Sequence, residues 1–338
     1  MLINPKDVKK IAIFRALQLG DLLCAVPAFR ALRAAYPDAT ITLLGLPWAE
    51  SFVKRFDRYF DDFKHFPGFP GLPEQGFNAA GTLSFLQEMN DQQFDLVLQM
   101  QGNGSIVNPL LELMGSKITA GFYRLEDYCP DSTLYLPYPQ GAHEIERHLQ
   151  LMDHLGIDRQ GSYLEFPLTD TDVEELKIAE LILEPGSYVC VHPGSRGSWR
   201  QWPPAFFALL ADICYEHGKQ VIITGTKNEI DIAEEVANRM QHTSIIAAGK
   251  TTLGSMAALI DNAYAIISNC TGPAHIAAAL RTRSIIISMD GEPERWTHQE
   301  KNLHYALDWT KNPDVDLAAK ATELMFDSNL IAESDAVL

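Results

Sequence analysis

Short apolar runs with the composition of buried strands alternate along this chain with stretches of helical length, and the alternation starts twice. Continuous runs of Ile, Val and Ala are typical of parallel strands that are buried on both faces, and intervening helices are typical of doubly wound α/β sheets. The polar stretch from Asp158 to Asp172 separates the two series. Because 338 residues are also too many for one ordinary core, we predict two Rossmann-like domains, 1–165 and 166–338.

The expected elements follow from apolar spacing. In the first half we predict strands at Lys10–Phe14, Ala39–Leu44 and Phe94–Met100, and helices at Leu22–Ala35, Trp48–Phe56 and Glu144–Leu155. In the second half we predict strands at Ser187–His192, Gln220–Thr224, Ser244–Ala247, Ala265–Ser268 and Ser284–Ile287, with a helix opened by Pro203 and another over Glu229–Met240. Residues 60–84 are rich in Phe, Pro and Gly, and we predict a long surface loop there.

The segment Ser268–His275 joins a predicted strand to a helix of small residues. Free N–H groups and the positive end of the helix dipole meet at such a turn, which favours an anion. Gly272 permits close approach of a ligand to the backbone, and Pro273 suits the first helical turn. The structural alternative is an ordinary turn that Thr271 caps.

The segment from His192 to Pro203 follows another predicted strand and combines Gly, Ser and Arg. Arg196 and Arg200 offer forked donors that suit a phosphate, and Ser195 adds a hydroxyl. A basic surface loop is the alternative. Because parallel strands present their carboxyl ends at one edge, ligands are expected beside these segments.

Two carboxylates occupy similar positions. Asp21 lies on the segment that follows the first strand, where it is either a general base or the N-cap of the next helix. Glu229 lies four residues after Gly225 and could contact ribose hydroxyls, although an exposed glutamate at a helix start is equally compatible with the pattern. No nicotinamide or P-loop fingerprint is present. We reject Asp61-Asp62 and Asp170-Thr171-Asp172 as metal motifs, since neither follows a clear strand.

The net charge of −17 argues against a nucleic-acid binder. Residues 1–60 nevertheless carry nine Lys and Arg against five Asp and Glu, and these basic residues are either a surface for an anionic acceptor or membrane, or scattered solvated charges. The five cysteines show no CxxC spacing, and the chain starts without the apolar region of a secretion signal. We therefore expect reduced thiols, a cytoplasmic protein with peripheral contact at the inner face of the cytoplasmic membrane as one option, no metal and no cofactor.

Taken together, these segments resemble glycosyltransferase family nine, the ADP-heptose:lipopolysaccharide heptosyltransferases, over roughly residues 9–300. The matching segments are Arg15–Asp21, Val26-Pro27-Ala28 with Leu32, Tyr36–Ala39, Gln101-Gly102, His192–Ser195, Arg200–Pro203, Thr224-Gly225 with Glu229, Thr271–His275, and Gly291 near Trp296. Each match is modest, but their order and spacing are specific.

The resemblance implies a GT-B fold, in which two Rossmann-like domains face each other across a cleft, with the acceptor on the first and the nucleotide sugar on the second. We also expect the last helix to pack back on the first domain. The implied activity is an inverting, metal-independent transfer of a heptose or related sugar from a nucleotide-diphosphate donor, ADP-heptose in the family, to the lipopolysaccharide core or another anionic glycolipid acceptor. Asp21 would be the general base and Arg200 would neutralise the departing diphosphate. The other expected donor contacts are Ser195, Arg196, Gly225, Glu229, Thr251, Cys270, Thr271, Gly272 and His275, and the expected acceptor contacts are Gly20 and Gln101.

The chain departs from the family pattern at Cys270, where the family usually has aspartate. A thiol does not accept strong hydrogen bonds from sugar hydroxyls. The alternative hypothesis is therefore a degenerate family member that binds nucleotide sugar or glycolipid without turnover. A sugar-nucleotide epimerase is a third option, but the carboxylate and histidine set for it is not apparent.

Overall fold

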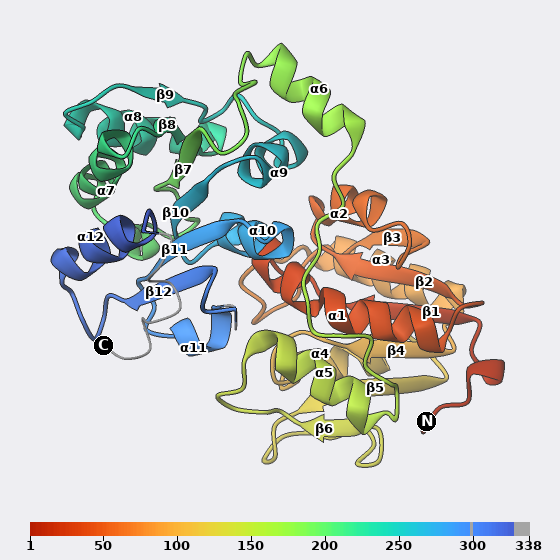
Figure 1. Ribbon diagram of the computed structural model, residues 1–338. Helices are drawn as coiled ribbons and strands as arrows, with labels where there is room; N and C mark the ends of the chain where they lie inside the picture. Colours follow the sequence, from red (N-terminus) through yellow and green to blue (C-terminus); the bar gives the residue numbers. More distant parts are fainter. Residues whose placement is uncertain (298–299, 328–338) are drawn as a thin grey trace. The chain divides into compact units, whose positions relative to one another are not determined.

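The computed structural model describes residues 1–297 and 300–327, and the chain divides into two compact units, Met1–Tyr163 and Leu164–Leu338 (Figure 1). The division lies inside the polar stretch between the two series of predicted elements. Each unit contains one six-stranded parallel sheet. In the described part of the chain, no helix combines the length and the apolar character that crossing a bilayer requires.

The N-terminal sheet has the strand order β3-β2-β1-β4-β5-β6. Its strands are β1 (Lys10–Phe14), β2 (Thr40–Gly45), β3 (Asp62–His65), β4 (Leu96–Gln99), β5 (Ile118–Tyr123) and β6 (Tyr135–Pro137). The helices are α1 (Leu19–Ala35), α2 (Ala49–Arg55), α3 (Ala79–Gln92), α4 (Val107–Glu112) and α5 (Glu144–His154). Strands β1 and β4 lie at the centre and are almost entirely buried, and α1 packs beside α5.

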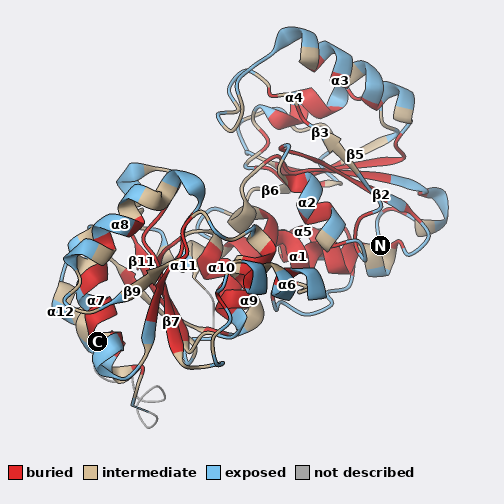
Figure 2. Cartoon of the chain, turned by 90° about the horizontal axis from the view of Figure 1, so that it is seen from above, coloured by how far each residue is buried: buried red, intermediate tan, exposed pale blue. Residues whose placement is uncertain are grey.

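The C-terminal sheet has the order β12-β11-β10-β7-β8-β9, which is the same topology traced from its other edge. Its strands are β7 (Tyr188–His192), β8 (Gln220–Ile223), β9 (Ser244–Ile246), β10 (Ala265–Asn269), β11 (Arg283–Ser288) and β12 (His304–Asp308). The helices are α6 (Asp170–Ile178), α7 (Pro204–Glu216), α8 (Ile230–Arg239), α9 (Leu253–Asp261), α10 (Gly272–Leu280), α11 (Pro293–Trp296) and α12 (Val315–Leu324). In each unit the buried residues concentrate on the central strands and the helix faces against them (Figure 2).

Both sheets therefore have the doubly wound order in which the chain reverses its direction of travel between two central strands. That reversal falls between β1 and β4 in the N-terminal unit and between β7 and β10 in the C-terminal unit. Ligands of such sheets bind outside the carboxyl ends of the strands at this point. The fold class predicted from the alternating pattern is confirmed, and the topology defines where each unit would hold a ligand.

The central strands agree with the sequence prediction to within two residues, whereas α1 begins three residues earlier than predicted and the loop predicted over 60–84 is wrong at both ends. Residues Asp62–His65 form the edge strand β3, which pairs with β2, and α3 begins at Ala79. An edge strand is only partly buried, so its polar sequence carries no apolar run that would have revealed it. Helix α12 packs on α7 of its own unit, and the expectation that the last helix also packs on the N-terminal domain stays a prediction.

Candidate functional site

Asp21 lies in the first turn of α1, directly after β1. Gln18 is the residue at the helix N-cap, and Asp21 occupies the third helical position, where its Oδ2 accepts a hydrogen bond from the backbone N–H of Gln18 at 3.2 Å. The interpretation of Asp21 as the N-cap is therefore wrong, because α1 begins three residues earlier than predicted. Its carboxylate stabilises the helix start from inside the first turn. Gly20 lies in the same turn and is half-buried.

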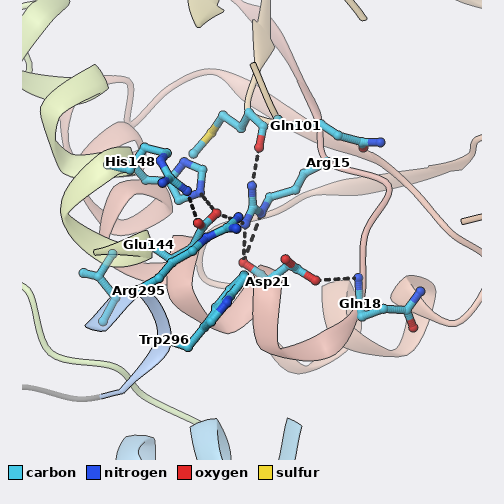
Figure 3. Close-up of polar contacts among 12 residues, drawn as sticks. Arg15, Gln18, Asp21, Gln101, Glu144, His148, Arg295 and Trp296 are labelled. Atoms are coloured by element: carbon cyan, nitrogen blue, oxygen red, sulfur yellow. Dashed lines mark hydrogen bonds and ion pairs between the residues drawn. The ribbon is translucent and has the colours of Figure 1, made fainter. Parts of the chain in front are cut away.

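The backbone of Asp21 is held by Arg15, whose side chain is only 1% exposed. Arg15 donates from Nε and Nη2 to the carbonyl oxygen of Asp21, at 3.0 and 2.7 Å, and from Nη1 to the carbonyl of Met100 (Figure 3). Its Nη2 also pairs with Glu144 Oε1 at 3.2 Å. One buried guanidinium thus joins the segments that follow β1 and β4, which are the two strands at the reversal point.

Gln101 reinforces the same junction. Its Oε1 accepts a hydrogen bond from the backbone N–H of Ala16 at 2.6 Å, and the side chain is buried. The expected contact between Gln101 and the acceptor stays a prediction, and the observed side-chain bond shows how this residue shapes the loop that carries Asp21.

Glu144 lies at the start of α5 among three basic groups, Arg15, Arg147 and His148. Burial by itself raises the pKa of Glu144, but the surrounding His148, Arg15 and Arg147 outweigh burial and hold the pKa well below its usual range. For His148, burial and the neighbouring Arg15 together lower the pKa to about 4, against the opposing effect of Glu144. Sequence reasoning missed this buried network, because its members come from α5 and from the segment after β1 and share no local motif.

The neutral state of His148 predicts a loss of stability in acid. The unfolded chain protonates this histidine below about pH 6.5, whereas the folded chain does so only near its folded pKa of about 4. Stability therefore falls as the pH drops from about 6.5 towards 4, by at most about 1.4 kcal/mol per pH unit for one such group. Urea unfolding at pH 7, 6 and 5 should show this slope, and His148→Gln should flatten it. Equal slopes in the two proteins would contradict the assignment.

In the C-terminal unit, Asn269 ends β10 and organises the loop that follows β7. Its side chain is fully buried; its Oδ1 accepts from the backbone N–H of Trp202 at 2.9 Å, and its Nδ2 donates to the carbonyl of Pro193 at 2.8 Å. Trp202 is in turn buried against Phe207 and Trp309. These contacts hold the loop containing Ser195, Arg196 and Arg200 beside the end of β10. The sequence placed Asn269 in the turn but did not predict that its side chain holds the loop after β7.

Glu229 lies close to the same loop. A Cβ atom added at Gly194 would collide with the Glu229 carboxyl group, so the glycine is what permits the approach. Glu229 Oε2 also accepts from the backbone N–H and the hydroxyl of Thr226, at 2.7 and 2.9 Å. The structure thus brings together the predicted residues that follow β7 and β8. Gly225 is packed against Ala248 and the stem of Glu229, while Thr251 lies half-buried just before α9.

The turn after β10 carries a buried hydroxyl without a bond. Thr271 Oγ1 has no hydrogen-bond partner within the described residues, and Thr271 is followed directly by the first turn of α10. His275, one turn into α10, is buried with its ring 6.1 Å from that of Trp296. The alternative that Thr271 caps the helix through its side chain is wrong, because no such cap bond forms. A hydroxyl and the helix N-terminus that includes Gly272 are thereby available to an anion.

Arg200 is on the short 3-10 turn Ser198–Arg200. Its Nε is buried and has no partner in the described part of the chain, whereas Arg196 is exposed and Ser195 is buried. Cys270 is buried as well. Of the predicted donor residues, the structure therefore gathers those that follow β7 and those that follow β10, on two neighbouring strands.

Residues 1–297 and 300–327 contain no group of three His, Cys, Asp or Glu side chains arranged to hold a metal ion. No disulfide joins the five cysteines, all of which the structure describes. Metal independence stays a prediction.

The basic residues of the first sixty positions do not all form a surface. Arg33 donates to the carbonyl of Ala39 at 2.7 Å and pairs with Asp61, and the buried Arg30 donates to the carbonyl of Tyr163 at 2.9 Å. Both arginines stabilise the N-terminal unit internally. The predicted contact with a membrane or an anionic acceptor therefore rests on the remaining basic residues.

Comparison with known proteins identifies relatives over nearly the whole chain. Residues 82–322 match the model of the family described as "Glycosyltransferase family 9 (heptosyltransferase)". The chain is 31% identical to lipooligosaccharide heptosyltransferase 2 of Haemophilus ducreyi, covering 83% of each protein. It is 25% identical to a lipopolysaccharide heptosyltransferase 3 of Escherichia coli, covering 94% of this chain and 95% of that protein.

A solved structure extends the likeness to the fold. The chain is similar to the Escherichia coli ADP-heptose lps heptosyltransferase II, with a TM-score of 0.72 at 16% identity, over 94% of this chain and 98% of that one. At this identity the likeness shows the fold alone, which is GT-B.

Proposed function

Because the chain belongs to glycosyltransferase family 9, and is therefore a glycosyltransferase, we propose that it transfers a heptose from ADP-heptose to a sugar hydroxyl of a lipopolysaccharide core, with inversion at the anomeric carbon. The observation that carries the proposal is the pair of buried polar atoms without a partner among the described residues, Thr271 Oγ1 at the start of α10 and Arg200 Nε on the loop after the neighbouring strand β7. Unsatisfied buried donors of this kind are costly unless a ligand satisfies them.

The C-terminal unit would bind the donor. The diphosphate of ADP-heptose carries the charge that Arg200 and the N–H groups of α10 favour. Gly272 and His275 belong to α10 itself, and Ser195 and Arg196 lie on the loop after the neighbouring strand β7. Glu229 and Gly225 would meet the ribose, and Thr251 the adenine. Fixed donors of this type stabilise a departing anion without reorganisation, which suits ADP as a leaving group.

The N-terminal unit would bind the acceptor through Gly20, Gln101 and the basic residues that remain exposed. In the proposed reaction Asp21 accepts the proton of the acceptor hydroxyl as its oxygen attacks C1 of the heptose. The new C1–O bond forms while the bond from C1 to the β-phosphate oxygen breaks, and ADP leaves with that electron pair. Attack opposite the leaving group inverts the configuration, and one general base suffices. Peripheral contact with an anionic membrane would bring the protein to a glycolipid acceptor.

The test is turnover with a panel of nucleotide sugars. ADP-heptose should be consumed in the presence of a lipopolysaccharide that lacks its terminal heptose, and the other nucleotide sugars should be consumed far more slowly. Mass spectrometry follows both substrates. Preferential turnover of a different nucleotide sugar would contradict the proposed donor.

Cys270 favours one alternative, a protein that binds nucleotide sugar without transferring it. Burial raises the pKa of this thiol to about 12, so it is neutral and supplies no carboxylate at the turn. Tight ADP-heptose binding without consumption under any acceptor condition would support this alternative.

Chelation of metal ions is expected to leave turnover unchanged. Arg200 and the α10 N-terminus would supply the charge stabilisation that a metal supplies in other transferases. Initial rates are measured after EDTA treatment, with magnesium or manganese added back as the control. A rate that is lost with EDTA and returns with either cation would show that the reaction requires a metal ion, and would contradict the proposed mechanism.

A further inference from the structure

Asp290, two residues beyond the end of β11, presents a carboxylate whose side chain is only 6% exposed. Its Oδ1 accepts hydrogen bonds from the hydroxyl of Ser288 at 2.7 Å and from the backbone N–H of Glu292 at 3.3 Å. Its Oδ2 lies 2.9 Å from Nη2 of Arg200. Every partner is a donor, so both oxygens are fixed and the carboxylate has one orientation.

Arg200 is consequently held on two sides. Its guanidinium carbon lies 4.9 Å from the ring centroid of Trp199, and its Nη2 forms an ion pair with Asp290. The side chain is 36% exposed, yet its Nε is buried and unpartnered among the described residues. The guanidinium is planar, so an ion pair at one nitrogen and a ring against one face together fix its orientation. The directions of its remaining N–H groups are then fixed as well.

The same carboxylate acts on the turn after β10. The pKa of Cys270 is raised by burial and further by Asp290, while Arg200 opposes the rise. Both charges of the Asp290–Arg200 pair therefore act on the pKa of Cys270. The negative charge near this turn comes from the β11 loop rather than from the turn itself.

We propose that Asp290 is a positioning residue for the donor site: it fixes the Arg200 guanidinium so that Nε and Nη1 meet the diphosphate of the nucleotide sugar. This inference rests on the proposed function and extends it to a residue that no sequence motif marked. Asp290 itself does not touch the diphosphate, because a carboxylate would repel it.

Asp290→Asn separates positioning from simple charge. The amide oxygen of asparagine can still accept the hydrogen bonds from the Ser288 hydroxyl and the Glu292 N–H. The amide NH₂ then faces Arg200, and because both groups are donors the contact with Arg200 is lost. If Asp290 were only a negative charge near the site, its loss would strengthen ADP binding. If it positions Arg200, its loss weakens ADP binding, by at least about threefold for one charged hydrogen-bond arrangement at a partly exposed site.

The experiment is a double-mutant cycle on ADP affinity by calorimetry, with Asp290→Asn and Arg200→Ala, singly and combined. In the Arg200→Ala background only the charge of Asp290 remains, so Asp290→Asn is expected to strengthen ADP binding. A reversal of sign between the two backgrounds is the signature of positioning, and a merely structural residue would not produce it. The matched control is Asp308→Asn, which removes a carboxylate at the end of the neighbouring strand β12 that pairs with Lys311, and it should leave ADP affinity unchanged.

Ser288→Ala provides a second, milder variant that keeps the charge and removes one hydroxyl from Oδ1. It should also weaken ADP binding, and only when Arg200 is present. Asp290→Asn that strengthens ADP binding in the parent protein, or weakens it equally in both backgrounds, would overturn the positioning role. A parent protein that does not bind ADP at all would overturn the proposed function and this inference together, whereas ADP binding without the reversal overturns this inference alone.

Discussion

Replacement of Asp21 by asparagine is expected to lower sugar transfer by at least about a hundredfold, because a general base contributes typically 10²–10⁴-fold in rate. The amide oxygen can still accept the hydrogen bond from the Gln18 N–H, so the start of α1 is preserved. We therefore expect a melting temperature within a few degrees of the parent, since the loss of one favourable dipole contact costs about 0.3–1 kcal/mol. Donor affinity should be unchanged. Single-turnover transfer and a thermal melt measure the two effects.

Asp172 offers a matched structural control. It occupies the third position of α6 and accepts from the backbone N–H of Thr169 at 2.8 Å, as Asp21 does from Gln18. Asp172→Asn should change stability by a similar amount and leave transfer intact. Near-native transfer by Asp21→Asn would mean that Asp21 stabilises α1 and does not act as the base.

Removal of the Arg200 side chain is expected to weaken ADP binding at least about tenfold, a loss of ~1.4 kcal/mol. Charged hydrogen bonds are worth roughly 1.5–3 kcal/mol each, and partial exposure of Arg200 reduces that value. Arg200→Ala also leaves Asp290 as a carboxylate without its partner beside the site, which adds repulsion. Calorimetric titration with ADP measures the change.

The control for this substitution is Arg239→Ala, which removes an exposed arginine that pairs with Glu235 on the same helix, α8. It should leave ADP affinity at the parent value. An Arg200→Ala protein that melts normally and binds ADP as tightly as the parent would exclude Arg200 from the diphosphate site.

The sequence predicted the central strands well because burial on both faces leaves continuous apolar runs. Strand β1 is the clearest case, with the predicted and observed bounds the same at Lys10–Phe14. The sequence prediction failed at the sheet edge, where Asp62–His65 has no apolar run and joins the sheet through backbone pairing with β2. Local pattern also misplaced the start of α1, since Gln18 at the N-cap is not a residue that usually marks one.

The candidate site was predicted in part, for a related reason. Segments such as Thr271–His275 combine a turn, a glycine and a helix start within a few residues, and their chemistry is visible locally. The groups that hold them are not local. Glu144 reaches Arg15 across 129 positions, and Asp290 reaches Arg200 across ninety, so only the fold brings each pair together.

We propose that this protein transfers a heptosyl group from ADP-heptose with inversion. The most direct measurement combines ADP-heptose with a lipopolysaccharide acceptor that lacks heptose, quantifies ADP release, and determines the anomeric configuration of the product by NMR. We predict one ADP released for each heptose added and an inverted configuration at C1. Retention at C1, or saturable binding of ADP-heptose with no release of ADP, would contradict the proposed reaction.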